Sequence, residues 1–514
     1  MARPAGRSGK REREAKLSAW AGFTLPDLDG VISGVVASPL DDAKLTANYW
    51  DTADLRLVRS GLSLRHRAGT GENGWTVKLP EGEEGPALVR RELSFDGSSG
   101  VVPAGAASLL RAHLRDAPLA PVSRLVTLRR RVELRDAEGA KVAEIDDDEV
   151  SVFEGRRLAA RFREVEVELA DHAPAALLGA VIGRLRFAGA GQADPVPKIV
   201  RALGAKALEP LPLAQLSRLP PLGVPSGEVT ARDVVRAAIA SSAQRLLRHD
   251  PGVRLGDDPE DVHQARVATR RLRSDLRTFR SLVDVEWAVG IRDELAWIAA
   301  ELGAVRDADV LDERLRRLVT GLPEQDARGA AALLRRLAAE RAAARTRLLG
   351  GLDSERYVRL LDSLEDAAVN PRCQPESDAR AADVVAELVR RPWKHLAGAV
   401  DALGPEPADE ALHEVRIHAK RCRYAAEAVA PVAGKPAQRL ADAVAGVQSV
   451  LGDFHDAVVA EEWLRSAAPG GTDKAVVAGE LIALERQEAA ALRAGWKSAW
   501  KVASAKKLRS WLGS

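Results

Sequence analysis

The chain has 514 residues, of which 46% are hydrophobic and 29% are charged, and its formal net charge is +2 at pH 7. This length predicts more than one domain, and this composition excludes an intrinsically disordered protein. Because the overall charge is nearly balanced, any anion binding must come from local clusters of basic residues.

Several classes of protein are not expected. Cys373 and Cys422 have neither a CxxC partner nor a neighbouring histidine pair, which argues against a disulfide framework or a zinc site and favours a reducing cytoplasm. No apolar core follows the basic N-terminus, so we expect no signal peptide. No stretch approaches ~18 uninterrupted apolar residues, so we expect no membrane span. A composition rich in Ala and Arg and poor in Lys is typical of a GC-rich bacterial genome.

The periodicity changes once along the chain. Up to about Leu203, segments such as LSLRHR, WTVKLP, LVTLRRRVEL and FREVEVEL alternate at period two, which predicts antiparallel strands. Beyond about Ser226 the period becomes helical. We therefore predict a multi-domain α+β protein with a strand-rich domain (1–205), a Pro/Gly-rich linker (206–226) and an all-helical domain (227–512).

The polar faces of the predicted strands are sorted by charge. One strand carries Arg65 and Arg67 on its polar face, another carries Arg129 and Arg131, and FREVEVEL carries three glutamates on its own. Glutamates at i and i+2 lie only ~7 Å apart and repel one another, and Mg²⁺ or Mn²⁺ would neutralise them. A polyanion could then bridge metal and arginines. A sheet with one solvated, charged face is the alternative, and the pattern alone leaves both open.

The N-terminal part resembles a known family. EREAK places Glu12, Glu14 and Lys16 at alternate positions, in the form of the ExExK motif of the CYTH family, the triphosphate tunnel metalloenzymes. YWDTADLRLVRSGLSLRHR, WTVKLP, RRE, LRRRVEL, EIDDDEV and FREVEVEL follow in the family's order. The resemblance implies an eight-stranded antiparallel β-barrel that forms a tunnel, with flanking helices, and that binds a triphosphate and a divalent metal.

The same resemblance implies roles for individual residues. The metal ligands, for Mg²⁺ or Mn²⁺, would be Glu12, Glu14, Glu166 and Glu168. The substrate-binding residues would be Lys16, Arg65, Arg67, Lys78, Arg90, Arg129, Arg131 and Lys198. The catalytic residues would be Glu12, Glu14, Lys16 and Asp148. The register of Asp148 is ambiguous because Asp146 and Asp147 precede it, and Lys198 could equally be a surface lysine.

One feature departs from the family pattern. Arg11, Arg13 and Ala15 alternate with the motif residues, so the outer face of this strand lacks the usual apolar side chains. We therefore expect the strand to be an exposed edge or frayed, either of which would weaken metal binding. His66 points away from Arg65 by parity, and we expect it to be structural.

The helical part contains an internal repeat. VHQARVATRRLRSDLRTFR aligns without a gap to LHEVRIHAKRCRYAAEAV, so that His263 matches His413 and Arg266 matches Arg416. LGAVRDADV and LGDFHDAVV match further along. The simplest account is a duplicated helical bundle, with copies at about 227–370 and 380–512.

A basic stripe runs along the first repeated helix. At about 100° per residue, its basic side chains fall within roughly 100° of arc. Leu272, Leu276 and Phe279 occupy the adjoining arc, and the i,i+4 acidic partners of an ordinary surface helix are missing. The stripe therefore predicts a bound anion. The alternative is that Asp307, Asp309 and Asp456 pair with it.

A duplicated HxxRxxxRRxR-like helix followed by LGxxxDA resembles the CHAD family of helical domains, which is associated with polyphosphate binding. By match, the polyphosphate-binding residues would be His263, Arg266, Arg270, Arg273, Arg277, His413, Arg416, Lys420 and Arg423. The second copy is weaker, since Glu427 stands where Arg277 stands in the first. Histidines gain charge mainly below about pH 6.5, so binding should strengthen on mild acidification.

Together these patterns predict metal-dependent hydrolysis of inorganic triphosphate or a related phosphoanhydride, coupled to polyphosphate binding that raises the local substrate concentration. A non-catalytic polyphosphate-binding protein, associated with cytoplasmic granules, is the alternative. Nucleic-acid binding is not expected, because the stripe lacks an interleaved aromatic stacking platform. Cyclase activity occurs in the tunnel family and is not excluded.

Overall fold

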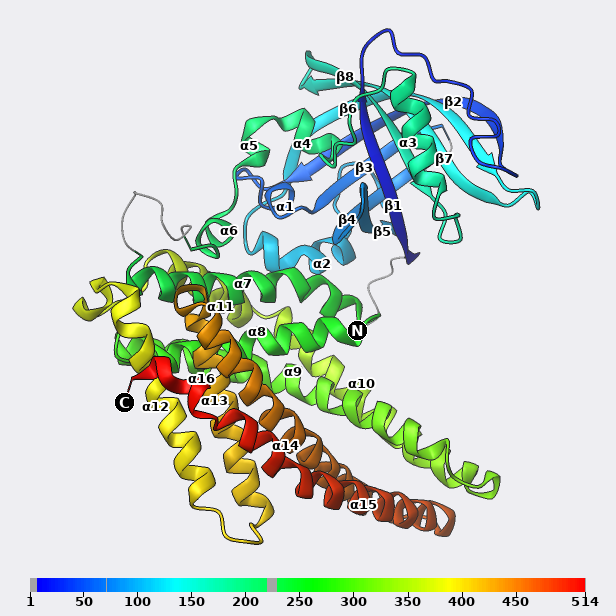
Figure 1. Cartoon of the computed structure of the whole chain (residues 1–514). Helices are drawn as coiled ribbons and strands as arrows, with labels where there is room; N and C mark the ends of the chain where they lie inside the picture. Colours follow the sequence, from blue (N-terminus) through cyan, green and yellow to red (C-terminus); the bar gives the residue numbers. More distant parts are fainter. Residues whose placement is uncertain (1–6, 71, 220–228, 514) are drawn as a thin grey trace. The chain divides into compact units, whose positions relative to one another are not determined.

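The computed structural model describes residues 7–70, 72–219 and 229–513 (Figure 1). The chain divides into two compact units, Met1–Leu211 and Pro212–Ser514. The predicted linker 206–226 spans this division. Its residues 220–226 lie outside the described residues, and the rest includes the short helix α6 (Pro212–Leu216).

The first unit is a closed antiparallel β-barrel, as predicted. Its strands, in chain order, are β1 (Arg7–Ala19), β2 (Val36–Asp51), β3 (Ser63–Gly69), β4 (Glu72–Glu84), β5 (Ala87–Phe95), β6 (Ala120–Arg135), β7 (Lys141–Glu154) and β8 (Arg157–Leu169). Their order around the barrel is β1-β5-β4-β3-β2-β6-β7-β8. The helices of this unit are α1 (Arg56–Arg59), α2 (Ala104–Leu114), α3 (Leu177–Phe187), α4 (Lys198–Leu203) and α5 (Ala205–Leu208).

The expectation that the first strand is an exposed edge or frayed is wrong. β1 pairs with β5 on one side and with β8 on the other, because barrel closure leaves no edge. The arginines on its outer face pair with a glutamate at the end of β4, the strand beyond β5. Arg11 Nη2 lies 2.6 Å from Glu84 Oε1, and Arg13 Nε lies 3.0 Å from Glu84 Oε2.

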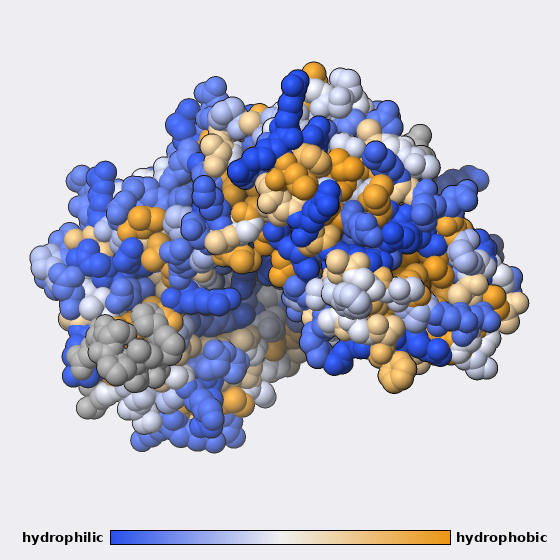
Figure 2. Space-filling view, turned by 90° about the horizontal axis from the view of Figure 1, so that it is seen from above, coloured by the Kyte–Doolittle hydropathy of each residue, from blue (hydrophilic) through white to orange (hydrophobic). Residues whose placement is uncertain are grey.

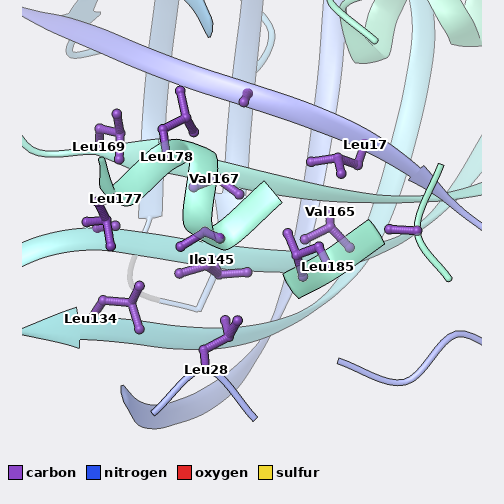
Figure 3. Packing of buried hydrophobic residues seen from close by; sticks show 14 of the residues in the cluster. Leu17, Leu28, Leu134, Ile145, Val165, Val167, Leu169, Leu177, Leu178 and Leu185 are labelled. Atoms are coloured by element: carbon purple, nitrogen blue, oxygen red, sulfur yellow. The ribbon is translucent and has the colours of Figure 1, made fainter. Parts of the chain in front are cut away.

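The outer face of β1, β7 and β8 packs against α3. Leu17, Ile145, Val165 and Val167 are fully buried there, and Leu185 contributes from the helix (Figure 3). Burying a side chain of this size stabilises the fold by about 1.5–3 kcal/mol. Because successive side chains alternate across a strand, this apolar outer face forces the intervening charged residues into the barrel.

A second apolar cluster lies on the inner face of the barrel. Leu125 shares the inward parity of Arg129 on β6, Val152 that of Asp148 on β7, and Tyr49 stands opposite Arg65 of β3. Ile199 and Val200 of α4 pack against this cluster. The docking of α4 carries its first residue, Lys198, towards the lumen.

The second unit is all-helical, as predicted. After α6, its helices are α7 (Ala231–Leu255), α8 (Pro259–Thr278), α9 (Val285–Val319), α10 (Ala327–Leu352), α11 (Glu355–Val369), α12 (Ala381–Asp401), α13 (Asp409–Ala433), α14 (Lys435–Ala467), α15 (Thr472–Ala503) and α16 (Lys506–Arg509). Short 3₁₀ turns occur at Glu324–Asp326, Pro375–Asp378 and Ser510–Leu512.

The two sequence repeats are related by a local two-fold arrangement. The Ala231 N–H donates to the carbonyl oxygen of Ala379 (3.0 Å), and the Ala381 N–H donates to that of Val229 (2.9 Å). The alignment that matches His263 with His413 also matches Ala231 with Ala381 and Val229 with Ala379. Equivalent residues therefore exchange hydrogen bonds, which places α8 and α13 in equivalent positions.

Among the described residues, no helix combines the length and apolar character that crossing a membrane requires. Figure 2 shows hydrophilic and hydrophobic residues intermixed over the face in view. Trp20, Val101 and Phe187 are among the large apolar side chains that are exposed on the barrel unit.

Candidate functional site

The barrel lumen brings together most of the residues that the motifs predict. Glu12, Glu14 and Lys16 are buried, as inward parity on β1 requires. The buried basic residues of the lumen are Lys16, Arg65, Lys78, Arg90 and Lys198. Arg67, Arg129 and Arg131 share the inward parity of their strands and are half-buried.

Carboxylates from three adjacent strands stand directly opposite one another on one side of the lumen. Glu14 of β1 stands opposite Glu168 of β8, which in turn stands opposite Glu144 of β7. One row further along, Asp146 stands opposite Glu166. Like charges directly opposite each other are destabilising, so this side of the lumen needs cations.

Lysines from the chain itself neutralise the carboxylates of β1. Lys78 Nζ lies 2.5 Å from Glu12 Oε2, and Lys16 Nζ lies 3.2 Å from Glu14 Oε2. Lys16 also contacts Glu166. Each predicted phosphate-binding lysine on these strands is thus held by a predicted metal ligand.

Lys198 belongs to the site and is not a surface lysine. Its Nζ lies 2.7 Å from Glu166 Oε2 and 3.2 Å from Glu164 Oε1, and it contacts Asp148. Asp148 also accepts two hydrogen bonds from Arg129, at 2.8 and 2.7 Å.

Of the three aspartates in the EIDDDEV segment, two face the lumen and one faces outward. Asp146 and Asp148 are both buried on the inner face of β7, whereas Asp147 points outward and pairs with Arg163 at 2.6 Å. His66 also lies on an outer face, edge-on to Trp75 with ring centroids 5.3 Å apart, as expected of a structural residue.

Burial and crowding shift the proton affinity of the acidic groups. Burial raises the pKa of Asp146 to about 8, and the nearby carboxylates of Asp148 and Glu166 add to this against the opposing charge of Arg129. Burial likewise raises the pKa of Glu12, despite Lys78. Asp146 therefore takes up a proton more readily than an exposed aspartate, although its Oδ2 contacts Arg129.

The carboxylate oxygens of the lumen are the kind of ligand that a hard divalent cation prefers. Glu14 Oε1 and Asp146 Oδ1 are buried and accept no hydrogen bond within the described parts of the chain. No group of three or more His, Cys, Asp or Glu side chains in those parts is close enough together to hold a metal as it stands. The predicted ligands contact ammonium groups instead, and Glu168 lies beside Lys10 with 29% of its side chain exposed. Metal binding would require these lysines to move.

The sequence prediction did not include several acidic residues of the lumen. Asp146, Glu164 and Glu144 lie on inner faces, and Glu92 lies 3.0 Å from Lys78. Parity could have identified three of them, since Glu92 alternates with Arg90, Glu164 with Glu166, and Asp146 with Asp148.

In the helical unit, α8 and α13 meet with their basic faces. The Arg270 guanidinium lies 5.5 Å from the ring centroid of Tyr424. Gly303 of α9 and Gly452 of α14, from the two LG motifs, lie against Arg266 and Arg416: a Cβ on either glycine would be in van der Waals contact with the arginine Nε, at 3.5 or 3.7 Å.

Carboxylates neutralise this surface only in part. Arg266 pairs with Asp307 at 3.1 Å, whereas Asp309 pairs with Arg341 outside the stripe. Burial and the charges of Arg416, Arg270 and Arg266 lower the pKa of Lys420 to about 7, against the opposing effect of Asp456.

The histidines of this surface gain charge at a lower pH than the sequence suggested. Burial and nearby basic side chains lower the pKa of His263 and of His413 below the usual value. Lys420, whose pKa is about 7, is therefore a group of this surface that titrates near neutrality.

Comparison with known proteins agrees with this architecture. Residues 10–202 match the CYTH domain, and residues 237–465 match the CHAD domain. Two uncharacterised proteins of Mycobacterium tuberculosis, from strains CDC 1551 and H37Rv, are each 32% identical over 476 residues, which covers 88% of this chain and 88% of each relative.

Solved structures resemble parts of the chain. PptA from Streptomyces chartreusis (26% identity, TM-score 0.45) covers 53% of this chain with 100% of its own length. The CHAD domain from the plant Ricinus communis (27% identity, TM-score 0.47) covers 54% of this chain with 93% of its own length. A putative adenylyl cyclase from Hippeastrum, described as having a dominant triphosphatase activity, covers 41% of this chain with 99% of its own length (18% identity, TM-score 0.23). On the sequence matches, the chain belongs to the proteins that join an N-terminal CYTH domain to a C-terminal CHAD domain.

Proposed function

We propose that the barrel hydrolyses inorganic triphosphate or a related phosphoanhydride with Mg²⁺ or Mn²⁺, and that the helical domain binds polyphosphate. The observation that carries the proposal is the charged lumen. Removing a charge from water costs several kcal/mol unless it is well paired. Packing at least five buried cations beside carboxylates from three strands is therefore poorly explained by stability alone.

The basic residues suit phosphoryl transfer, in which catalysis is mostly positioning and electrostatic stabilisation. Arg65 and Arg90 present guanidinium groups, whose forked N–H donors match phosphate oxygens. Lys16 and Lys78 would exchange their carboxylate partners for phosphate oxygens when substrate enters. Because burial raises the pKa of Asp146 to about 8, this group can carry a proton and donate it in a hydrogen bond to a phosphate oxygen.

Glu12, Glu14, Glu166 and Glu168 would hold the divalent cation, which when bound supplies Lewis-acid stabilisation of the phosphoryl oxygens and lowers the pKa of bound water. The chain's own contribution is orientation. Asp148 holds Arg129 and Lys198 in the lumen, where both can contact phosphate oxygens.

The experiment that tests this measures phosphate release from tripolyphosphate with and without Mg²⁺ or Mn²⁺. Glu14→Gln should lower the rate by at least about 10- to 100-fold, in line with the loss of groups that support a metal site. Arg13→Gln is the matched control, because Arg13 is one residue away on the same strand and points outward. Absence of phosphate release by the wild type with either metal would contradict the enzymatic proposal.

A non-catalytic polyphosphate-binding protein is the second candidate. The contacts of Glu12 and Glu14 with lysines favour it, since they compete with metal binding. Tight polyphosphate binding without phosphate release in any metal would select it. A cytoplasmic location, with association to polyphosphate granules, belongs to either proposal and agrees with the free thiols of Cys373 and Cys422.

The polyphosphate-binding surface would be the basic faces of α8 and α13, with Arg266, Arg270, Arg416 and Lys420 at its centre. Nucleic acid remains a disfavoured ligand, and competition between polyphosphate and RNA at matched salt tests this. Incubation with ATP and the same metals, with detection of a cyclic nucleotide product, tests for cyclase activity.

A further inference from the structure

In the second half of the helical domain, two arginines clamp a carboxylate. Glu427 of α13 accepts a hydrogen bond from Arg423 Nε at 2.7 Å, and its other oxygen lies 3.0 Å from Arg271 Nη1 of α8. Asp275 is buried beside this clamp, and burial raises its pKa to about 7. This side of the α8–α13 contact is therefore filled by acids of the chain itself.

The local two-fold arrangement places a different set of residues on the other side. Under the alignment that matches His263 with His413, Arg271 corresponds to Arg421 and Arg423 to Arg273. Glu427 corresponds to Arg277. The two clamp arginines are thus kept, whereas the carboxylate between them is replaced by a third arginine. Asp275 corresponds to Ala425, so the second acid is missing as well.

A fourth arginine, Arg292 of α9, joins this cluster. Partial burial of Arg277, whose side chain still reaches solvent, and the charges of Arg421, Arg292 and Arg273 lower its pKa to about 10, so these groups lie near one another. Within residues 229–513, no carboxylate forms an ion pair with any of the four arginines. The Nε atoms of Arg421 and Arg292 are buried and donate no hydrogen bond to any described residue.

Buried N–H groups without partners and unbalanced like charges are both unfavourable, unless a ligand supplies acceptors and negative charge. Arginine forks match the oxygens of a phosphate as they match a carboxylate. The clamp around Glu427 shows that this arrangement of helices can hold an oxyanion. The cluster of Arg273, Arg277, Arg292 and Arg421 presents the same kind of donors, but no carboxylate stands at the position that corresponds to Glu427.

We propose that Arg273, Arg277, Arg292 and Arg421 form a subsite for one phosphate group of bound polyphosphate, and that Glu427 closes the related subsite by occupying it with its own carboxylate. This inference rests on the proposed polyphosphate binding by the helical domain. The duplicated domain then offers polyphosphate one such arginine subsite and not two. The bound polyphosphate would therefore contact the two halves of the domain unequally.

The test measures binding of long-chain polyphosphate to the full-length protein, without divalent metal so that no hydrolysis occurs. Arg421→Gln should weaken binding by about tenfold or more, as expected for loss of a hydrogen bond to a charged group. Arg271→Gln is the matched control, since it removes the same charge from the equivalent position. It should change the affinity less than about twofold, because Arg271 is engaged by Glu427.

Two further variants keep the proposal testable if Arg421→Gln does not fold. Arg277 is exposed, so Arg277→Gln should fold and should also weaken binding. Glu427→Gln should strengthen binding, because it opens the second clamp.

The failures of the two proposals are distinguishable. If the wild type binds no polyphosphate, the proposed function of the helical domain fails, and the inference fails with it. If Arg266→Gln weakens binding while Arg421→Gln and Arg271→Gln have equal effects, polyphosphate binding stands and the asymmetric subsite is refuted.

Discussion

Replacing Lys198 with methionine should destabilise the barrel strongly, although methionine has nearly the same length. The Lys198 side chain is only 9% exposed, and its ammonium group contacts Asp148, Glu164 and Glu166. Removing one partner from a buried ion pair costs about 3–5 kcal/mol. The lower end of this range applies here, because burial already raises the pKa of Glu164 and the carboxyl group can take up a proton.

Hydrogen exchange of individual peptides is the assay of choice, since it reports on the barrel separately from the helical unit. A loss of about 3 kcal/mol corresponds to roughly a hundredfold faster exchange in β7 and β8, at about 1.4 kcal/mol per factor of ten. Peptides from α14 provide the internal reference. Lys206→Met is the matched control, because Lys206 is exposed on α5.

Unchanged protection of β7 and β8 in Lys198→Met would refute the reasoning, since it would show that the buried carboxylates do not depend on this ammonium group. The double variant Lys198→Met/Glu164→Gln should recover part of the lost protection, because it removes one of the carboxylates left without a cation.

Three further outcomes are expected. Polyphosphate binding should weaken as the pH rises through about 7, because Lys420 loses its positive charge and Asp275 gains a negative one in the same range, and a titration of the wild type against Lys420→Met measures this. Glu485→Leu should cost about 3 kcal/mol in the free energy of unfolding by urea, because the buried Arg314 loses its buried partner and keeps only the more exposed Glu488, whereas the double variant with Arg314→Leu should be close to neutral. Glu84→Gln removes only surface ion pairs on the outside of the barrel, so it should cost less than about 1 kcal/mol and leave phosphate release unchanged.

The inward or outward direction of the barrel side chains could be predicted from the sequence. A strand has only two faces, so an apolar set such as Val165 and Val167 assigns Glu164 and Glu166 to the opposite one. The same reasoning assigned His66 to the outside. Closure of the barrel could not be read from β1, whose outer face carries Arg11 and Arg13 and therefore resembles an edge.

The pairing of charges across the lumen could not be predicted. It depends on the register between strands that are distant in sequence, such as Glu14 opposite Glu168. Lys198 belongs to a short helix, where parity gives no direction, and it reaches the lumen only because α4 docks on the inner apolar cluster. The arginine cluster on the helical domain likewise depends on how α8, α9 and α13 pack.

The pairing of β1 with β8 also has a consequence for biosynthesis. The carboxylates of Glu14 and Glu168 meet only when the first strand joins the last one, a contact of high sequence separation. Such contacts slow folding because a long loop must close before any favourable interaction compensates for the lost chain entropy. During synthesis on the ribosome, β1 emerges before β8, so a nascent chain carries the ExExK residues long before the barrel lumen is complete.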